Sequence, residues 1–129
     1  MVLTKELVVH QAAILLSLLI AGTAHSAEVN ETVPDQFQGT WAGSVAECSA
    51  RAAESRFVLS EKRIAFWESQ GPVLAVASDR ELELALIVEL SAEGQTWLET
   101  RQFRLSVDRN TLSDVTGHQL PVTRVRCKV

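Results

Sequence analysis

The apolar and polar positions from residue 37 onward alternate in short runs, which is the pattern of β-strands. One clear run is "LELALIVEL", residues 82–90, in which leucine or valine occupies every second position. A helical period of about 3.6 residues would also align Leu82, Leu86 and Leu90, and leucine, alanine and glutamate have good helix propensity. The unbroken alternation and the neighbouring strand signals favour a strand.

The segment "FQGTWAGSV", residues 37–45, predicts the first strand of the folded domain. Its alternation places Phe37, Trp41 and Val45 on one face, together with two glycines. A glycine inside a strand marks a bend or a close approach of another backbone.

Two apolar runs, "RFVLS" at residues 56–60 and "RIAFWE" at residues 63–68, are separated by two charged residues and predict a hairpin. Phe57 and Leu59 should pair near Ile64 and Phe66. Trp67 directly follows Phe66, so it is predicted on the opposite face of the strand from Ile64 and Phe66. It either faces outward as a contact surface or lies inside after a slip of register.

Residues 96–107, "TWLETRQFRLSV", predict a strand with two charged residues on its apolar face. That face carries Trp97, Glu99, Arg101, Phe103, Leu105 and Val107. Either a bulge near Thr100 turns Glu99 and Arg101 outward, or both point inward at the mouth of a barrel. We favour the bulge, because bulges are common at barrel rims and a buried pair is costly to desolvate.

The whole pattern gives about eight short strands separated by polar turns, which is typical of a sandwich or barrel. Residues 49–55 are expected to form a short helix or a turn, and residues 28–36, "EVNETVPDQ", are expected to form a flexible linker. The predicted fold class is all-β, with one barrel domain over residues 37–129.

The first 27 residues have the order of a secretory signal peptide. Lys5 precedes the apolar block 12–21, and small residues follow up to Ala27. The block is shorter than the about 20 residues that span a bilayer. Thr23 occupies the position where a lipoprotein would carry its lipidated cysteine. We expect cleavage after Ser26 or Ala27 and a soluble protein that is periplasmic or secreted.

Export bears on the two cysteines, Cys48 and Cys127, which both lie in the exported part. An even cysteine count in an oxidising compartment favours a disulfide. The net charge is −4 and no basic stripe is present, so nucleic acid is not an expected partner.

Gly39-Thr40-Trp41 resembles the Gly-x-Trp signature of lipocalins and their relatives. The resemblance implies an eight-stranded up-and-down barrel in which the tryptophan closes one end. It also implies that an arginine of the last strand packs across the tryptophan, and Arg124 and Arg126 stand where such an arginine should be. A disulfide from the last strand towards the front of the chain occurs in the family as well.

The sequence offers little catalytic chemistry. His118 is the only histidine after the leader, and Asp114 or Asp108 would have to complete a triad with a nucleophile that nothing marks. One histidine and two paired cysteines leave no zinc-like spacing. We therefore expect no enzyme activity, no metal and no cofactor.

Two functions fit a small exported barrel. The first is a lipocalin-like carrier that binds a small apolar ligand, with Trp97, Glu99, Arg101 and Phe103 as the candidate lining residues. The alternative is an interaction protein of the cell envelope, such as an inhibitor of a protease or a lysozyme. An open pocket would favour the carrier and a filled core would favour the interaction protein.

Overall fold

The structure, a computed structural model, describes residues 26–117 and 120–128. Nearly all of the predicted leader, and His118, lie outside the described residues. The strands of the described part are β1 (Glu28–Asn30), β2 (Gly39–Ala42), β3 (Phe57–Leu59), β4 (Arg63–Ala65), β5 (Gln70–Asp79), β6 (Glu83–Ala92), β7 (Gln95–Leu105), β8 (Thr111–Asp114) and β9 (Val122–Arg126). Two short 3-10 helices, η1 (Asp35–Phe37) and η2 (Ala46–Ser49), flank β2.

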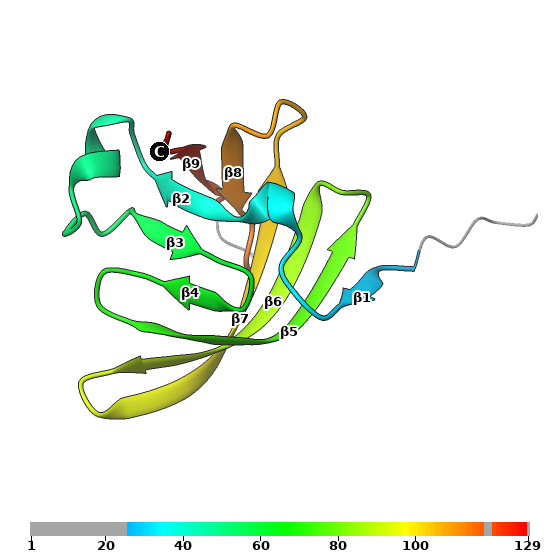
Figure 1. Cartoon of the computed structure of the whole chain (residues 1–129), viewed down its shortest axis with the longest axis horizontal. Coiled ribbons are helices and arrows are strands. Elements are labelled where there is room, and N and C mark those ends of the chain that lie inside the picture. The colour runs from blue at the N-terminus through cyan, green and yellow to red at the C-terminus, as the bar shows by residue number, and fades with distance from the viewer. Residues whose placement is uncertain (1–25, 118–119, 129) are drawn as a thin grey trace, which may run out of the picture.

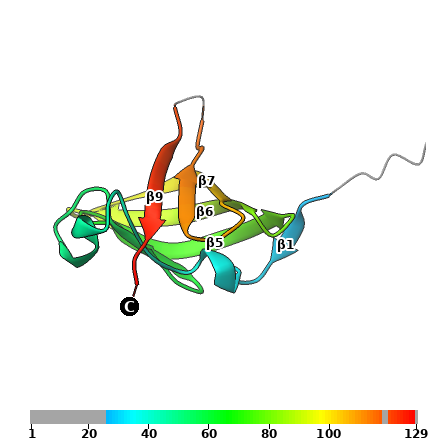
Figure 2. The ribbon, with the colours of Figure 1, turned by 90° about the horizontal axis from the view of Figure 1, so that it is seen from above.

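Strands β2 to β9 form a closed, eight-stranded antiparallel barrel (Figure 1). Each strand pairs with the next along the chain, and the barrel closes because β2 also pairs with β9. Figure 2 shows that β8 and β9 run steeply across the direction of β5 and β6. The predicted all-β up-and-down barrel is confirmed. No helix in the described ranges is long and apolar enough to cross a membrane.

The segment expected to be a linker contributes to the folded unit. β1 pairs with β5 through Glu28↔Ser78 and Asn30↔Val76, and the side chain of Val33 is buried in the core. Three strand residues followed by a buried valine leave too little pattern for periodicity to detect. The domain therefore begins before residue 37.

Residues 82–90, for which the pattern fitted both a strand and a helix, were predicted to form a strand, and β6 confirms that prediction. β6 buries alternate side chains, Leu84, Leu86, Val88 and Leu90, and directs the intervening residues outward. The predicted hairpin is confirmed as β3 and β4, which pair Leu59 with Ile64.

The first strand is shorter than predicted. β2 ends at Ala42, and the chain then turns into η2, so that Val45 is exposed rather than on the inner face with Trp41. Local alternation continues past the strand end, but the turn into η2 is what brings Cys48 towards the last strand. A tertiary constraint overrides the local pattern here.

The interior of the barrel is filled by its own side chains. The largest fully buried ones are Trp41, Phe37, Phe57, Phe103, Leu59, Ile64, Leu86, Leu90, Leu105, Leu112, Val33 and Val88. Close packing of this kind is expected in a small barrel, where inward side chains from all walls meet.

Gly71 allows the barrel wall to bend. A Cβ built at Gly71 would lie 1.6 Å from the backbone oxygen of Glu89 on the neighbouring strand, so only glycine fits without movement of the backbone. The pairing of β5 with β6 shifts by one residue soon afterwards, between Val73 and Ala75. Before this shift β5 pairs with β4, and after it β5 pairs with β1.

Candidate functional site

One end of the barrel is closed by Trp41. Its ring is fully buried, and its indole N–H donates a hydrogen bond to the carbonyl oxygen of Phe37 at 3.0 Å. The guanidinium carbon of Arg126 lies 4.3 Å from the centre of the indole ring. A cation held over an indole face at this distance is a favourable contact. Of the two arginines considered from the sequence, Arg126 is the one that covers Trp41.

Arg126 is also held by backbone carbonyls from two other segments. It donates to Gln36 O at 2.6 Å, to Gln38 O at 2.8 Å and to Arg109 O at 2.9 Å. Gly39 gives the guanidinium room, because a Cβ there would lie 3.1 Å from Nη1 and its φ of +139° is rare for other residues. This end is therefore a plug made by stacking and hydrogen bonding.

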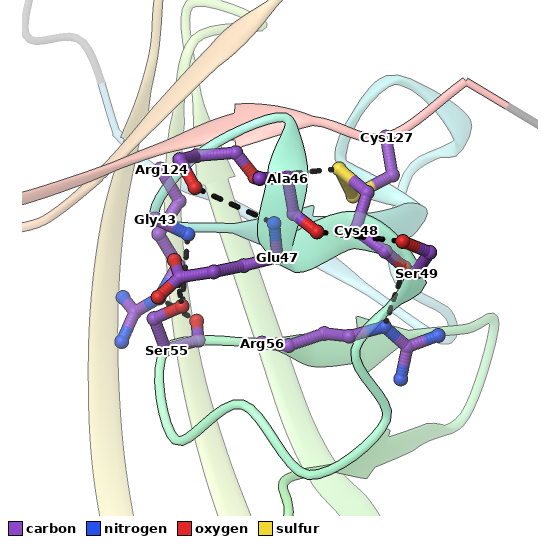
Figure 3. The surroundings of a disulfide bond; sticks show 10 residues. Gly43, Ala46, Glu47, Cys48, Ser49, Ser55, Arg56, Arg124 and Cys127 are labelled. Atoms are coloured by element: carbon purple, nitrogen blue, oxygen red, sulfur yellow. Dashed lines mark hydrogen bonds between the residues drawn. A yellow bond between two sulfur atoms is a disulfide. The ribbon is translucent and has the colours of Figure 1, made fainter.

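The predicted disulfide is present, and Figure 3 shows it between η2 and the segment that follows β9. It joins Cys48 of η2 to Cys127, the residue directly after β9. The Cα atoms of the two cysteines are 5.5 Å apart. Arg56 donates to the carbonyl oxygen of Cys48 at 3.2 Å, and the backbone N–H of Cys127 donates to Thr40 O at 2.8 Å. In the loop-entropy model a crosslink over this separation contributes on the order of 4 kcal/mol.

The opposite end, called the mouth here, carries the charged side chains of Glu99, Arg101, Asp114 and Arg124, which line one hollow. β6 and β7 pair without interruption from Glu83↔Arg104 to Ala92↔Gln95. The bulge that we favoured near Thr100 is therefore wrong, and Glu99 and Arg101 point inward.

The inward pair is stable because Arg101 has a second acidic partner. Its Nη2 lies 3.0 Å from Glu99 Oε2, and its Nη1 lies 2.9 Å from Asp114 Oδ2. The side chains of Arg101, Glu99 and Asp114 are 24%, 35% and 11% exposed. Charge-assisted hydrogen bonds on both sides of the guanidinium offset the cost of its partial desolvation.

Aromatic rings lie beneath this ion network. The guanidinium carbon of Arg101 is 4.9 Å from the ring centre of Phe66, and that of Arg124 is 5.1 Å from the ring centre of Phe57. Phe57 packs on Phe66 at 5.4 Å and on Phe103 at 5.6 Å between ring centres. Arginines over aromatic rings therefore cover both ends of the filled core.

Asp114 is the most buried acid of the mouth. Burial alone would raise the pKa of its carboxyl group, but hydrogen bonds from the Thr116 hydroxyl and backbone N–H, together with Arg101, lower that pKa below its ordinary value. The hydroxyl and N–H of Thr116 lie 2.6 and 3.0 Å from Asp114 Oδ1. Asp114 thus stays ionised and fixes both Arg101 and the start of the loop after β8.

A hollow of about 560 Å³ lies over the mouth. Its floor is the ion network of Glu99, Arg101 and Asp114, and its rim includes Leu120 and Val122. These two apolar side chains are 90% and 53% exposed. The hollow therefore combines a fixed polar floor with an apolar rim.

The four predicted ligand residues share one face of β7 but lie at different depths. Phe103 is buried in the core, Glu99 and Arg101 form the charged network, and Trp97 is 39% exposed opposite Leu90 near the end of the hairpin. They do not line one apolar pocket in the described part of the chain. Trp67 is half exposed and thus faces outward, one of the two alternatives that the sequence left open.

Sequence reasoning missed the role of Asp114. Its contact with Arg101 depends on the register Phe103↔Asp114 between β7 and β8, which residue types alone do not reveal. Within the described ranges no cluster of three or more His, Cys, Asp or Glu side chains could hold a metal ion. Comparisons with protein-family models, curated proteins and solved structures found no match to the chain.

Proposed function

We propose that this protein is an exported, non-enzymatic barrel that binds another protein of its compartment through the hollow over the mouth. The observation that carries the proposal is the polar floor of Glu99, Arg101 and Asp114 beneath the exposed Leu120 and Val122. The leader and the disulfide support export, since structural disulfides persist in oxidising compartments.

The filled interior argues for a protein partner rather than a small apolar ligand inside the barrel. Carriers of the lipocalin type keep a cavity within the barrel. Here the volume between the walls is occupied by Phe57, Phe103 and the other core side chains, and Arg101 and Arg126 lie over the aromatic rings at the two ends. The Trp41–Arg126 plug supports a lipocalin-like architecture used for a different purpose.

The mouth has the composition of a small interface. Interfaces combine apolar contacts with arginine and aromatic side chains, and their charged groups work best when they are already oriented. Arg101 is held by two carboxylates before any partner binds, so little side-chain entropy remains to be lost. The apolar rim formed by Leu120 and Val122 would supply the contact area around that fixed centre.

A hydrolase is the partner class that we propose, because small exported barrels with one disulfide include protease and lysozyme inhibitors. The purified protein should slow one enzyme of a panel of proteases and lysozymes, measured as residual activity against inhibitor concentration. Val122→Glu, which adds charge at the rim, should weaken that inhibition by at least about tenfold, or about 1.4 kcal/mol.

Leu74→Glu is the matched control, because Leu74 is an equally exposed side chain on the outer wall of β5. It should inhibit like the unmodified protein. Absence of inhibition across the panel would overturn the hydrolase assignment, and equal weakening by both variants would overturn the assignment of the mouth.

A further inference from the structure

Strand β7 extends well beyond the strand that pairs with one of its edges. β6 pairs with β7 from Gln95 to Arg104, whereas β8 pairs only with Phe103, Arg104 and Leu105. Gln102 makes the last contacts on the β8 side, to the N–H of Val115 and the hydroxyl of Thr116. The first half of β7 therefore has one strand neighbour among the described residues.

The backbone groups on that open edge belong to Thr96, Leu98 and Thr100. The N–H of Leu105 points to β6, where it donates to Leu82 O at 2.7 Å, and the C=O of Gln102 points to the β8 side. Successive residues of a strand direct their N–H and C=O groups to opposite edges. The even-numbered residues of β7 thus face away from β6. In the described part of the chain these groups of Thr96, Leu98 and Thr100 have no hydrogen-bond partner.

This edge is symmetric about Leu98. The residues whose backbone groups lie on this edge, Thr96, Leu98 and Thr100, read threonine, leucine and threonine from either end. Leu98 is 65% exposed, and Thr96 and Thr100 are exposed on the same outer face. Few small proteins leave such an edge open, because it is a template for another strand.

We propose that the open edge of β7 pairs antiparallel with the same edge of a second copy, about a two-fold axis at Leu98. The pairing would join Leu98 to Leu98 and each Thr96 to the other copy's Thr100, with about six backbone hydrogen bonds. A two-fold contact of this kind is closed and uses the same patch on both copies.

The outer face of the joined strands is complementary. Thr96 lies opposite Thr100 on both sides of the axis, and cross-strand threonine pairs are favourable. Leu98 meets its own copy at the centre and loses its exposed apolar surface. Ile87, exposed on β6 opposite Thr100, extends this apolar strip.

The inner face of the joined strands carries no directly opposed like charges. Trp97 faces the other copy's Glu99, and Arg101 faces Gln95. The two Glu99 side chains are diagonal neighbours, but each is already paired with the Arg101 of its own copy at 3.0 Å. Residues that lie opposite each other in two paired strands project from the same face of the sheet. The inward faces of the two β7 strands would therefore be continuous, and the two mouths would lie side by side. Thr100 also lines the hollow, so the strand of the second copy would form part of its border. The inference thus goes beyond the proposed function: it adds an assembly of two copies.

Sedimentation velocity of the exported protein over a range of concentrations tests the pairing. A dimer should form as concentration rises. Leu98→Pro should be monomeric yet folded, because the N–H that proline removes is not used by β6. Leu98→Lys would place two positive charges opposite each other at the axis, so it should be monomeric as well. It replaces the proline variant in the test if that variant misfolds.

Leu74→Lys, also exposed but on β5, should dimerise like the unmodified protein. Leu98→Cys should form a crosslinked dimer on mild oxidation, and Leu74→Cys should not. A protein that stays monomeric up to about 1 mM, or a dimer that Leu98→Lys leaves unchanged, would overturn the proposal. Either result is independent of whether the mouth inhibits a hydrolase.

Discussion

Single arginines do more at the ends of this barrel than their charge suggests. Arg126 contacts an indole face and donates to three carbonyls that come from two separate segments of the chain. Arg101 links two carboxylates across β7 and β8 and covers Phe66. The planar guanidinium suits both tasks, since it stacks on rings and presents several donors in fixed directions.

Arg126→Lys should therefore destabilise the fold although it keeps the charge. An ammonium group cannot reach Gln36, Gln38 and Arg109 at once and has no plane to stack on Trp41. We expect a loss of about 2–3 kcal/mol and a melting temperature lower by roughly 10 °C or more, measured by thermal denaturation. The exposed Arg63 provides the control, and Arg63→Lys should melt like the unmodified protein. Equal melting of both variants would contradict the plug.

Asp114 makes stability depend on pH. Because its pKa is lowered in the folded state, its ionised form stabilises the fold above the ordinary carboxyl pKa of about 4, and that stabilisation is lost as pH falls through the lowered value. The free energy of unfolding should thus fall on acidification below about pH 4. Asp114→Asn should be less stable than the unmodified protein at pH 7 and should lose less on acidification.

Chemical denaturation at pH 7 and at pH 3 measures this difference directly. Glu54→Gln removes one exposed charge and provides the comparison. If Asp114→Asn and Glu54→Gln show the same pH profile, Asp114 does not hold the mouth in the way described.

At the level of elements, β6 and β7 form the wall that carries the mouth. They pair without a break from residue 83 to residue 104, and this regularity is what turns Glu99 and Arg101 inward. β5 is irregular instead, with Gly71 against the backbone of Glu89 and a shift of register after Val73. The irregular strand bends the wall and the regular hairpin extends it.

Gly71→Ala should therefore disturb the barrel strongly. Its Cβ would meet the Glu89 carbonyl oxygen, a backbone atom that cannot move without breaking the β5–β6 pairing. The expected loss is about 3 kcal/mol or more. Gly94→Ala makes a contrasting variant, since it has open space but a φ of +76°. It should cost only about 1–2 kcal/mol. Chemical denaturation measures the free energy of unfolding of both variants. If Gly94→Ala lost more stability than Gly71→Ala, the close approach of Gly71 to the Glu89 carbonyl would be contradicted.

Most elements and the pairing of β3 with β4 were predictable from the sequence, whereas contacts that depend on the register between other strands were not. Strict alternation in residues 82–90 identified β6, and the charged break at Glu61 and Lys62 identified the β3–β4 hairpin. The pairing of Asp114 with Arg101 depends on a register between strands, which no local pattern encodes. The alternating pattern extends to Val45, but the strand ends at Ala42 and the chain turns into η2, where Cys48 bonds to Cys127.

On the scale of the whole molecule, the barrel is closed around its wall, filled inside and covered at both ends by arginines. The Trp41–Arg126 plug and the disulfide stabilise one end, whereas the mouth places a fixed ion network beneath exposed apolar side chains. This architecture is the basis of our proposal that the protein binds through its surface rather than its interior.

Native mass spectrometry of the protein purified from its own host tests that claim most directly. The account predicts a mass equal to that of the processed polypeptide, alone or as a dimer, together with a complex with a protein partner that Val122→Glu weakens and Leu74→Glu does not. A stoichiometric adduct of a few hundred daltons that survives in Val122→Glu would contradict it, because a small molecule would then occupy the barrel that the core side chains fill.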